Sequence, residues 1–314
     1  MLTISAYRLL AQVYESANSL IYRGRRVDTQ QPVVLKILKD SYPTPERTAW
    51  FKREYEITRN LTISGVVDAY ALFQDTERLV MVLEDFGGNS LDLLAIAGQL
   101  ELCEFLKLAI AITDILSQIH TANIIHKDIN PSNIVLNPTT GQVKIIDFGI
   151  STVLSRENPT LSNPNILEGT LAYISPEQTG RMNRAIDYRS DFYSLGATFY
   201  KLLTGTLPFN SCDTLELVHS HIAKQPVVPH SVVGKCFLPS IVSDIVMKLM
   251  AKNAEDRYQS AYGLKVDLEI CLHQLQTNGQ IDVFALARQD ICDRFQIPQK
   301  LYGRKREIET LLYR

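Results

Sequence analysis

The sequence predicts an α+β protein with a small sheet-rich lobe followed by a larger, mostly helical lobe. Two short apolar segments, Val33 to Leu38 and Leu79 to Leu83, have the composition of β-strands and flank one helical segment. From Ser90 onward the pattern is helical, and between residues 102 and 119 apolar side chains recur at spacings of three and four. Paired glycines at 87 and 88 separate the two regions, so we expect a flexible connection with a cleft between the lobes.

Composition narrows the functional classes. A chain of 314 residues with 46% hydrophobic and 21% charged residues can fill a core, which argues against global disorder. The net charge of -2 provides no basic field for nonspecific nucleic-acid binding. The five cysteines are dispersed without CxxC spacing, and the sequence contains neither a signal peptide nor an apolar run of membrane length. We therefore expect a reduced, cytoplasmic protein without a membrane segment.

Two charges fall among apolar residues of the first lobe. A helix is expected to begin at Thr44, with Pro45 in its first turn. Glu54 then shares the expected buried stripe with three apolar residues, Trp50, Ile57 and Leu61. In the strand, alternation places Lys36 on one face with Val34 and Leu38. The two charges can satisfy each other, although taken alone they also fit a snorkelling lysine and a glutamate at the helix rim.

The second lobe has two polar segments joined by an expected hairpin. His126 to Asn133 precedes the apolar run Ile134 to Leu136, and Asp147-Phe148-Gly149 follows a second run. The turn-rich residues 137–142 lie between the runs. The segments together provide carboxylate and amide oxygens, which suit Mg²⁺, and a carboxylate that could accept a hydroxyl proton.

This arrangement of HxD, an asparagine five residues later and DFG after a short hairpin resembles the protein kinase family, over about residues 7 to 275. The resemblance implies ATP and Mg²⁺ as cofactors and a catalytic set of Lys36, Glu54, Asp128, Asn133 and Asp147. In this set Lys36 would hold the α- and β-phosphates, Asn133 and Asp147 would hold the metal, and Asp128 would accept the proton of the substrate hydroxyl.

The same resemblance implies further nucleotide contacts. Leu83, Glu84 and Phe86 would form the hinge that faces adenine. The loop over the phosphates would correspond to residues 14–21, but this span contains no glycine. Its matching positions are Tyr14, Ser16, Ser19 and Ile21. Because glycine lets backbone amides approach phosphate closely, the substitution predicts weaker nucleotide binding.

Later motifs indicate a serine/threonine kinase of the eukaryotic, or Hanks, type. Gly169-Thr170 with Tyr173-Ile174-Ser175-Pro176-Glu177 is similar to the family's GTxxYxAPE segment, with serine in place of alanine. Glu177 is expected to pair with Arg257, and Asp191 is expected to brace the catalytic loop. Thr170, and Pro131 in the catalytic loop, resemble serine/threonine rather than tyrosine kinases, and the expected partner is a protein with a Ser or Thr acceptor.

Two residues of the catalytic loop depart from the family pattern. Lys127 replaces an arginine, which removes the bidentate group that binds a phosphorylated activation loop. Asn130 replaces a lysine that contacts the transferred phosphate, so slower transfer is expected. The glycine-free loop and Asn130 keep open a pseudokinase that acts as a nucleotide-binding or interaction module. A small-molecule kinase would lack the segment from Thr170 to Glu177.

The expected organisation is a first lobe at 1–83, a hinge at 84–89, a second lobe at 90–275 and a linker at 276–300. Residues 301–314 resemble the start of the large ATPase module that follows such kinases in bacterial multidomain signalling proteins, and equally fit a polar terminal helix. An ATPase or sensor module in a longer chain is therefore a possible partner.

Overall fold

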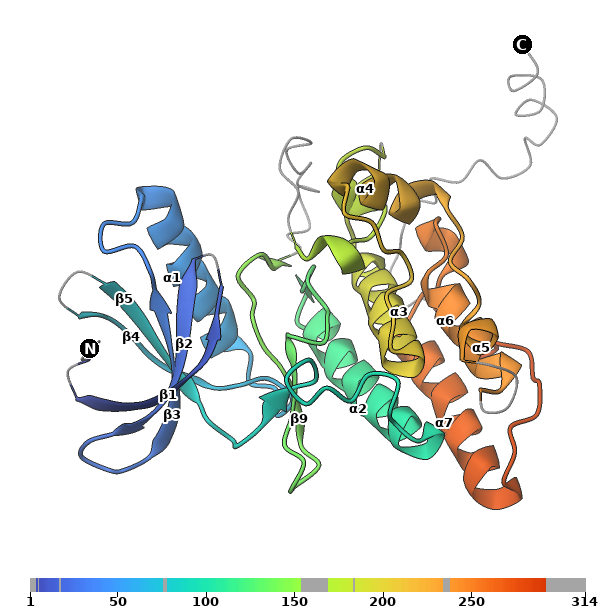
Figure 1. Ribbon diagram of the computed structural model, residues 1–314, viewed down its shortest axis with the longest axis horizontal. Helices are drawn as coiled ribbons and strands as arrows, with labels where there is room; N and C mark the ends of the chain where they lie inside the picture. Colours follow the sequence, from blue (N-terminus) through green and yellow to red (C-terminus); the bar gives the residue numbers. More distant parts are fainter. Residues whose placement is uncertain are drawn as a thin grey trace, which may run out of the picture.

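The computed structural model has a sheet-rich lobe and a helical lobe joined by a narrow connection (Figure 1). The structure describes residue 4 and residues 6–16, 18–75, 78–153, 169–182, 184–233 and 238–291. The predicted α+β fold class and the order of the two lobes are confirmed. The stretch 301–314 lies outside the described residues, and the domain boundaries remain predictions.

The first lobe is built on a five-stranded antiparallel sheet in the order β1-β2-β3-β5-β4. Its strands are β1 (Tyr7–Glu15), β2 (Ser19–Arg26), β3 (Pro32–Leu38), β4 (Ala69–Asp75) and β5 (Arg78–Glu84). Leu35 and Ile37 pack into a core on one face of β3, whereas Leu38 packs on the opposite face with residues of helix α1. Because side chains alternate along a strand, Lys36 lies on the α1 side.

Helix α1 (Pro45–Asn60) begins where the sequence predicts, since the Thr44 side chain accepts a hydrogen bond from the Arg47 amide. The buried stripe differs from the expected one. Glu54 is buried, but Trp50 is 59% exposed, and Phe51 takes the inner position instead. Consecutive helical residues differ by about 100° around the axis, so Trp50 lies at the edge of a stripe centred near Phe51 and Tyr55. The prediction for Trp50 was wrong because this largely polar helix buries only a narrow face.

The second lobe packs its helices around one large apolar core. Helix α2 (Leu102–Thr121) fulfils the predicted periodicity and packs against α7 (Ala261–Asn278) and α3 (Arg189–Thr204). The other helices among the described residues are α4 (Thr214–Ala223), α5 (Pro229–Val232) and α6 (Ser240–Leu249), with 3-10 helices at Leu171–Tyr173, Glu177–Thr179 and Ala254–Asp256.

Short strands lie where the lobes meet. The expected hairpin is present as β8 (Ile134–Leu136) and β9 (Val143–Ile145), and β6 (Asn89–Ser90) pairs with β8. A second pair joins β7 (Ile124–Ile125) to β10 (Thr152–Val153). This framework holds the polar segments on either side of the hairpin next to the lobe junction.

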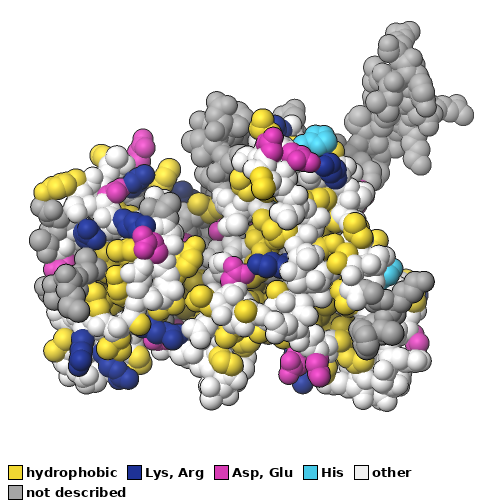
Figure 2. Space-filling model, viewed as in Figure 1, with side chains coloured by type: hydrophobic (Ala, Val, Ile, Leu, Met, Phe, Trp, Pro, Cys, Tyr) yellow, Lys and Arg dark blue, Asp and Glu magenta, His cyan; other side chains and the backbone are white. Residues whose placement is uncertain are grey.

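The surface view shows acidic and basic side chains interspersed with apolar ones over the face displayed (Figure 2). Among the described helices, none is both long and apolar enough to cross a membrane.

Candidate active site

An ion cluster connects the two lobes at the predicted position. The Lys36 ammonium on β3 lies 2.5 Å from Glu54 Oε1 on α1 and 3.0 Å from Asp147 Oδ1, which follows β9. Lys36 and Glu54 are buried, at 9% and 6% exposure. The predicted pairing of these two charges is confirmed, and Asp147 is brought to the same ammonium from the other lobe.

Electrostatics keep Lys36 and Asp147 charged, whereas burial outweighs the attraction of Lys36 and raises the pKa of Glu54 to about 7. Burial alone would lower the pKa of Lys36, but the Asp147 and Glu54 carboxylates outweigh it and raise the pKa. Burial would likewise raise the pKa of Asp147, but the ammonium of Lys36 and the Gly149 N–H lower it. Lys36 is therefore a protonated cation and Asp147 an ionised carboxylate at neutral pH.

The DFG segment adopts a constrained conformation. Asp147 has φ +80°, in the left-handed region that most non-glycine residues avoid. Its neighbour Phe148 is 1% exposed and packs against the His126 ring at a centroid distance of 4.9 Å. His126 Nε2 also lies 3.0 Å from the Ile146 carbonyl oxygen. These contacts fix the Asp147 side chain next to the catalytic loop.

Asp191 braces that loop, as the sequence predicts. Its buried carboxylate on α3 accepts hydrogen bonds from the His126 and Lys127 amides, at 2.9 and 2.7 Å. The His120 ring on α2 lies 2.8 Å from the same carboxylate. The loop backbone is thereby attached to the central helices.

Asp128 is held by the side chain and backbone around it. The Asn133 Nδ2 atom donates to the Asp128 carbonyl and to its Oδ2, each at 2.9 Å. The Thr170 amide donates to Asp128 Oδ1 at 2.9 Å. Because the Asn133 amide nitrogen faces Asp128, its amide oxygen faces away and can serve as a metal ligand.

The departure at Asn130 has a structural role inside the loop. This residue is 2% exposed, and its Nδ2 lies 3.2 Å from both the Asp128 carbonyl oxygen and Thr170 Oγ1. Its Oδ1 accepts from the Ser132 amide at 2.9 Å. Both the nitrogen and the oxygen of the Asn130 amide are thus hydrogen-bonded within the protein. The lysine that the family pattern has at this position is absent, and the neutral amide provides no positive charge in its place.

In the glycine-free loop, hydrogen bonds join the described residues Ser16 and Ser19 between β1 and β2. The Ser16 hydroxyl accepts from the Ser19 amide at 2.9 Å and donates to the Ser19 carbonyl at 3.3 Å. Tyr14 is 52% exposed, and Ile21 pairs with Lys36 across the sheet. The register relative to Lys36 is as expected, while the Ser16 hydroxyl closes the turn.

The hinge has contacts that the sequence analysis missed. The Lys144 ammonium, 5% exposed on β9, lies 2.6 Å from Glu84 Oε2 and 3.1 Å from the Val66 carbonyl oxygen. Asn137 donates to the Phe86 carbonyl at 2.6 Å. Lys144 is also a charge inside an apolar strand, but β9 has only three residues, which is too short for the alternation argument used for Lys36. Leu83 completes the predicted hinge set at the end of β5.

The stretch from Asp147 to Gln178, which we call the activation segment, has its end anchored in the helical lobe. Arg257 Nη1 and Nη2 contact the two Glu177 oxygens at 2.6 and 2.8 Å. Ser190 Oγ donates to Glu177 Oε1 at 2.7 Å. The predicted pair is therefore confirmed as a buried, bidentate ion pair.

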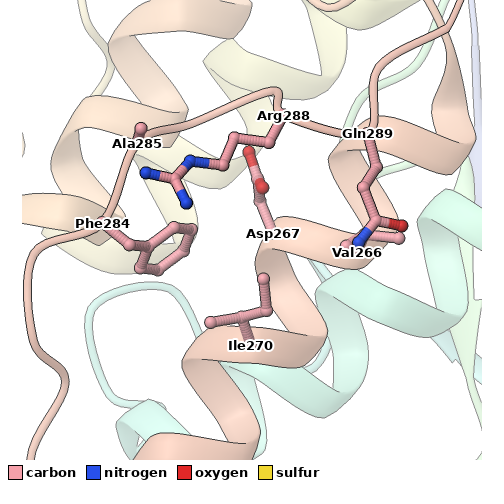
Figure 3. A pocket seen from close by; sticks show the side chains of 7 residues that line it. All are labelled: Val266, Asp267, Ile270, Phe284, Ala285, Arg288 and Gln289. Atoms are coloured by element: carbon pink, nitrogen blue, oxygen red, sulfur yellow. The ribbon is translucent and has the colours of Figure 1, made fainter.

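A separate pocket lies at the far end of the helical lobe (Figure 3). It has a volume of about 220 Å³ and is formed by α7 and the following segment. Asp267 and Arg288 are among the residues that line it, and none of the predicted site residues does so.

Comparison with known proteins agrees with this geometry. The family model described as "Protein kinase domain" matches residues 7–266. The chain belongs to the protein kinase family.

Its relatives include named serine/threonine kinases of bacteria. A probable serine/threonine-protein kinase of Clostridium perfringens is 32% identical, with 84% of this chain and 38% of that protein covered. The serine/threonine-protein kinase PrkC of Bacillus subtilis is 28% identical over 84% of this chain and 40% of its own length. A hybrid signal transduction histidine kinase of Dictyostelium discoideum is 33% identical over 66% of this chain and 8% of that protein. The chain thus spans less than half the length of each of these relatives.

Proposed function

We propose that this chain is a serine/threonine protein kinase domain that transfers the γ-phosphoryl group of ATP to a protein hydroxyl. The observation that carries the proposal is the contact of Lys36 with Glu54 and Asp147, which come from different lobes. Asp128 lies in the adjoining loop and is oriented by Asn133 and Thr170. The bacterial relatives that are serine/threonine kinases by name support a Ser or Thr acceptor.

The residues fit the roles that such a transfer requires. Lys36 would bind the α- and β-phosphates, and Glu54 would hold its ammonium in place. Asp128 would orient the acceptor hydroxyl and take its proton. Catalysis would then depend on positioning and charge stabilisation rather than on a covalent enzyme intermediate.

The donor set also fits magnesium. Asp147 and Asn133 offer one carboxylate and one amide oxygen, which suits a hard cation that prefers a few protein oxygens together with phosphate and water. When bound, the cation would neutralise charge on the phosphates. We assign its protein ligands to Asp147 and Asn133, and adenine to the hinge of Leu83, Glu84 and Phe86.

A pseudokinase remains the second candidate, because of two specific features. The turn at residues 14–21 lacks glycine, and the Ser16 hydroxyl is used to close it. Asn130 places a neutral amide where the family pattern has a cation. Both features favour weak or slow nucleotide chemistry, whereas the intact ion cluster favours activity.

Since the chain spans only part of each relative, we propose that ATPase or sensor modules follow it and that it acts in cytoplasmic signalling. The dispersed cysteines support a reducing compartment, and Cys103, Cys212 and Cys271 are free among the described residues.

The test separates binding from transfer. Affinity for ATP is measured by calorimetry with and without Mg²⁺, and transfer from γ-labelled ATP to a generic protein substrate is measured on the same preparation. The kinase proposal expects magnesium-dependent binding and transfer, and it expects Asp128→Asn to bind but not to transfer. Binding without any transfer by the unmodified protein would establish the pseudokinase instead.

A further inference from the structure

Gln178 connects the activation segment to the backbone next to Asp128. It lies directly after Glu177 and is 4% exposed. Its Nε2 donates to the Lys127 carbonyl oxygen at 2.8 Å. Its Oε1 accepts from the amide and the hydroxyl of Ser175, at 3.2 and 2.9 Å.

The surrounding groups determine which way this amide points. The Ser175 N–H can only donate, so it requires the amide oxygen, and the Lys127 carbonyl can only accept, so it requires the amide nitrogen. The Ser175 hydroxyl adds a second donor to the same oxygen. Serine in place of the family's alanine therefore reinforces one orientation of Gln178.

The residue that Gln178 contacts has an unfavourable backbone conformation. Lys127 has φ +69°, in the left-handed region, immediately before Asp128. Such a conformation persists when the surrounding structure over-determines it. Asp191 holds the N–H of Lys127 at 2.7 Å, and Gln178 holds its carbonyl at 2.8 Å.

Gly169 allows the activation segment to approach this carbonyl. A Cβ atom built on Gly169 would lie 3.2 Å from the Lys127 carbonyl oxygen and 3.6 Å from Asp128 Oδ1, and the residue has φ +99°. Gly169 and Gln178 of the activation segment therefore both lie against the Lys127 carbonyl of the catalytic loop.

We propose that Gln178, oriented by Ser175, is a positioning residue that holds the strained Lys127 peptide and thereby fixes Asp128 without a phosphorylated activation segment. This inference rests on the proposed kinase function. It assigns to a neutral, buried amide the ordering role that a phosphate-binding arginine next to the catalytic aspartate would otherwise have.

The decisive variant is Gln178→Glu, which keeps the shape of the side chain. An ionised carboxylate cannot donate to the Lys127 carbonyl, so we expect the kcat of the dephosphorylated enzyme at about pH 8 to fall about tenfold or more. The KM for ATP should change less than about threefold, because the nucleotide contacts lie elsewhere.

A protonated glutamate would restore the missing donor. Its carbonyl oxygen can accept from Ser175 and its hydroxyl can donate to Lys127, and burial raises the pKa of a carboxyl. We therefore expect the kcat ratio of Gln178→Glu to unmodified enzyme to rise at least about threefold between about pH 8 and pH 6. The methionine side chain of Gln178→Met has no hydrogen-bond donor and no titratable group. The ratio of its kcat to that of the unmodified enzyme should therefore stay low and constant between about pH 8 and pH 6.

Two further variants complete the experiment. Ser175→Ala keeps the backbone donor and should reduce kcat only about two- to fivefold, which tests the network even if Gln178→Glu does not fold. Gln276→Glu makes the same chemical change at an exposed position on α7 and is the matched control. Hydrogen exchange at residues 126–130 is measured on every variant as a readout independent of activity.

The outcomes distinguish this inference from the proposed function. The positioning role is supported if hydrogen exchange at residues 126–130 is faster in Gln178→Glu than in the unmodified protein at about pH 8, and if this difference shrinks at about pH 6. In Gln178→Met the difference should not shrink. This result would support the positioning role even if the unmodified protein transfers no phosphate. An unchanged kcat and unchanged exchange in Gln178→Glu would overturn it. A kcat ratio that is low but independent of pH would also overturn it, since the donor would then not be the relevant group.

Discussion

At the scale of single residues, the interaction between Lys36 and Glu54 should be large because both side chains are buried. Removing Lys36 leaves the buried Glu54 carboxyl without its cation, at a cost of roughly 3 to 5 kcal/mol for a well-buried pair, whereas removing Glu54 leaves Lys36 paired with Asp147. Lys36→Met, Glu54→Gln and the double variant form a thermodynamic cycle measured by urea denaturation. The double variant should lose less stability than the sum of the single changes.

An exposed pair provides the comparison. Lys39 lies 2.6 Å from Glu15, whose side chain is 54% exposed, and solvent screens such contacts. The corresponding cycle with Lys39→Met and Glu15→Gln should show little coupling. Equal coupling in the two cycles would contradict the account of a buried cluster.

The Glu177 carboxylate predicts how stability depends on pH. Burial would raise its pKa, but Arg257 and Ser190 outweigh burial and lower the pKa to about 2 from 4.5. A carboxylate whose pKa is lower in the folded than in the unfolded protein stabilises the fold at every pH above the unfolded-state pKa. This contribution to the free energy of unfolding is lost as the pH falls through the folded-state pKa. About 3 kcal/mol present at neutral pH should therefore disappear between about pH 4.5 and pH 2.

Glu177→Gln isolates this contribution. Unfolding by urea is followed across the acidic range for both proteins, and the difference between their free energies of unfolding should shrink as pH falls. Parallel curves for the two proteins would show that Glu177 does not carry the expected proton linkage.

Some of these residues can be predicted from sequence and others cannot. Lys36 and Glu54 are evident because a charge in an apolar pattern requires a partner. Lys144 carries the same signal in a three-residue strand, which is too short for alternation to be convincing. Gln178 carries no such signal, since a neutral amide after Glu177 is unremarkable until its contact with Lys127 is seen. Trp50 was misplaced because an apolar side chain at a helix edge fits the periodicity without being buried.

At the scale of elements, the activation segment is attached to the catalytic loop by hydrogen bonds from uncharged donors. Ser151 Oγ donates to the His126 carbonyl at 3.1 Å, the Thr170 amide donates to Asp128, and Gln178 donates to the Lys127 carbonyl. Three consecutive loop residues are therefore held without a phosphate.

We accordingly expect activity to depend little on phosphorylation of this segment. The candidate acceptors are Ser151, Thr152, Ser155, Thr160 and Ser162, of which Ser155, Thr160 and Ser162 lie outside the described residues. Dephosphorylated and autophosphorylated enzyme, verified by mass spectrometry, are compared on one peptide substrate. Ser151 is buried and its hydroxyl already binds the His126 carbonyl, so the alanine test is made at the other four residues. A large activation that disappears in one of these four alanine variants would show that a phosphate receptor exists.

The segment after α7 depends on a glycine in that helix. Asp290 accepts from the Gln259 amide and from Ser260 Oγ, both at 2.7 Å. A Cβ on Gly263 would lie 2.5 Å from Asp290 Cβ, so Gly263→Ala should displace residues 281–291 even though alanine favours a helix. Ala287→Gly is the control, because it relieves φ +60° in the same segment without this clash.

Limited proteolysis measures the displacement. Gly263→Ala should be cut within residues 281–291 faster than the unmodified protein, and Ala287→Gly should not. Equal cleavage rates for Gly263→Ala and the unmodified protein would contradict this packing.

The elements themselves followed largely from local patterns. Thr44 and Pro45 fix the start of α1, and the spacing of apolar residues fixes α2. The packing of residues 281–291 could not be anticipated, because it depends on a close backbone approach at Gly263 rather than on periodicity.

At the scale of the whole molecule, the two lobes meet through apolar packing of Ile57, Leu61 and Val66 on the core of the helical lobe and through specific ion pairs. Lys36 and Asp147 connect the lobes at the ion cluster, while Lys144 and Glu84 connect them at the hinge. The two-lobed fold was predictable because a sheet-forming region and a helical region succeed each other along the chain. The hinge ion pair was not, because residues 84 and 144 are far apart in the sequence and come together only across the lobe junction.

The most direct test of the account is phosphoamino-acid analysis of a protein substrate after incubation with γ-labelled ATP and Mg²⁺. Purified unmodified protein is compared with Asp128→Asn and Asp147→Asn, each shown by circular dichroism to be folded. We predict labelled phosphoserine or phosphothreonine with the unmodified protein only, because the two variants lack the proton acceptor and a metal ligand. Label of the same amount with either folded variant, or no label with the unmodified protein, would contradict the assignment.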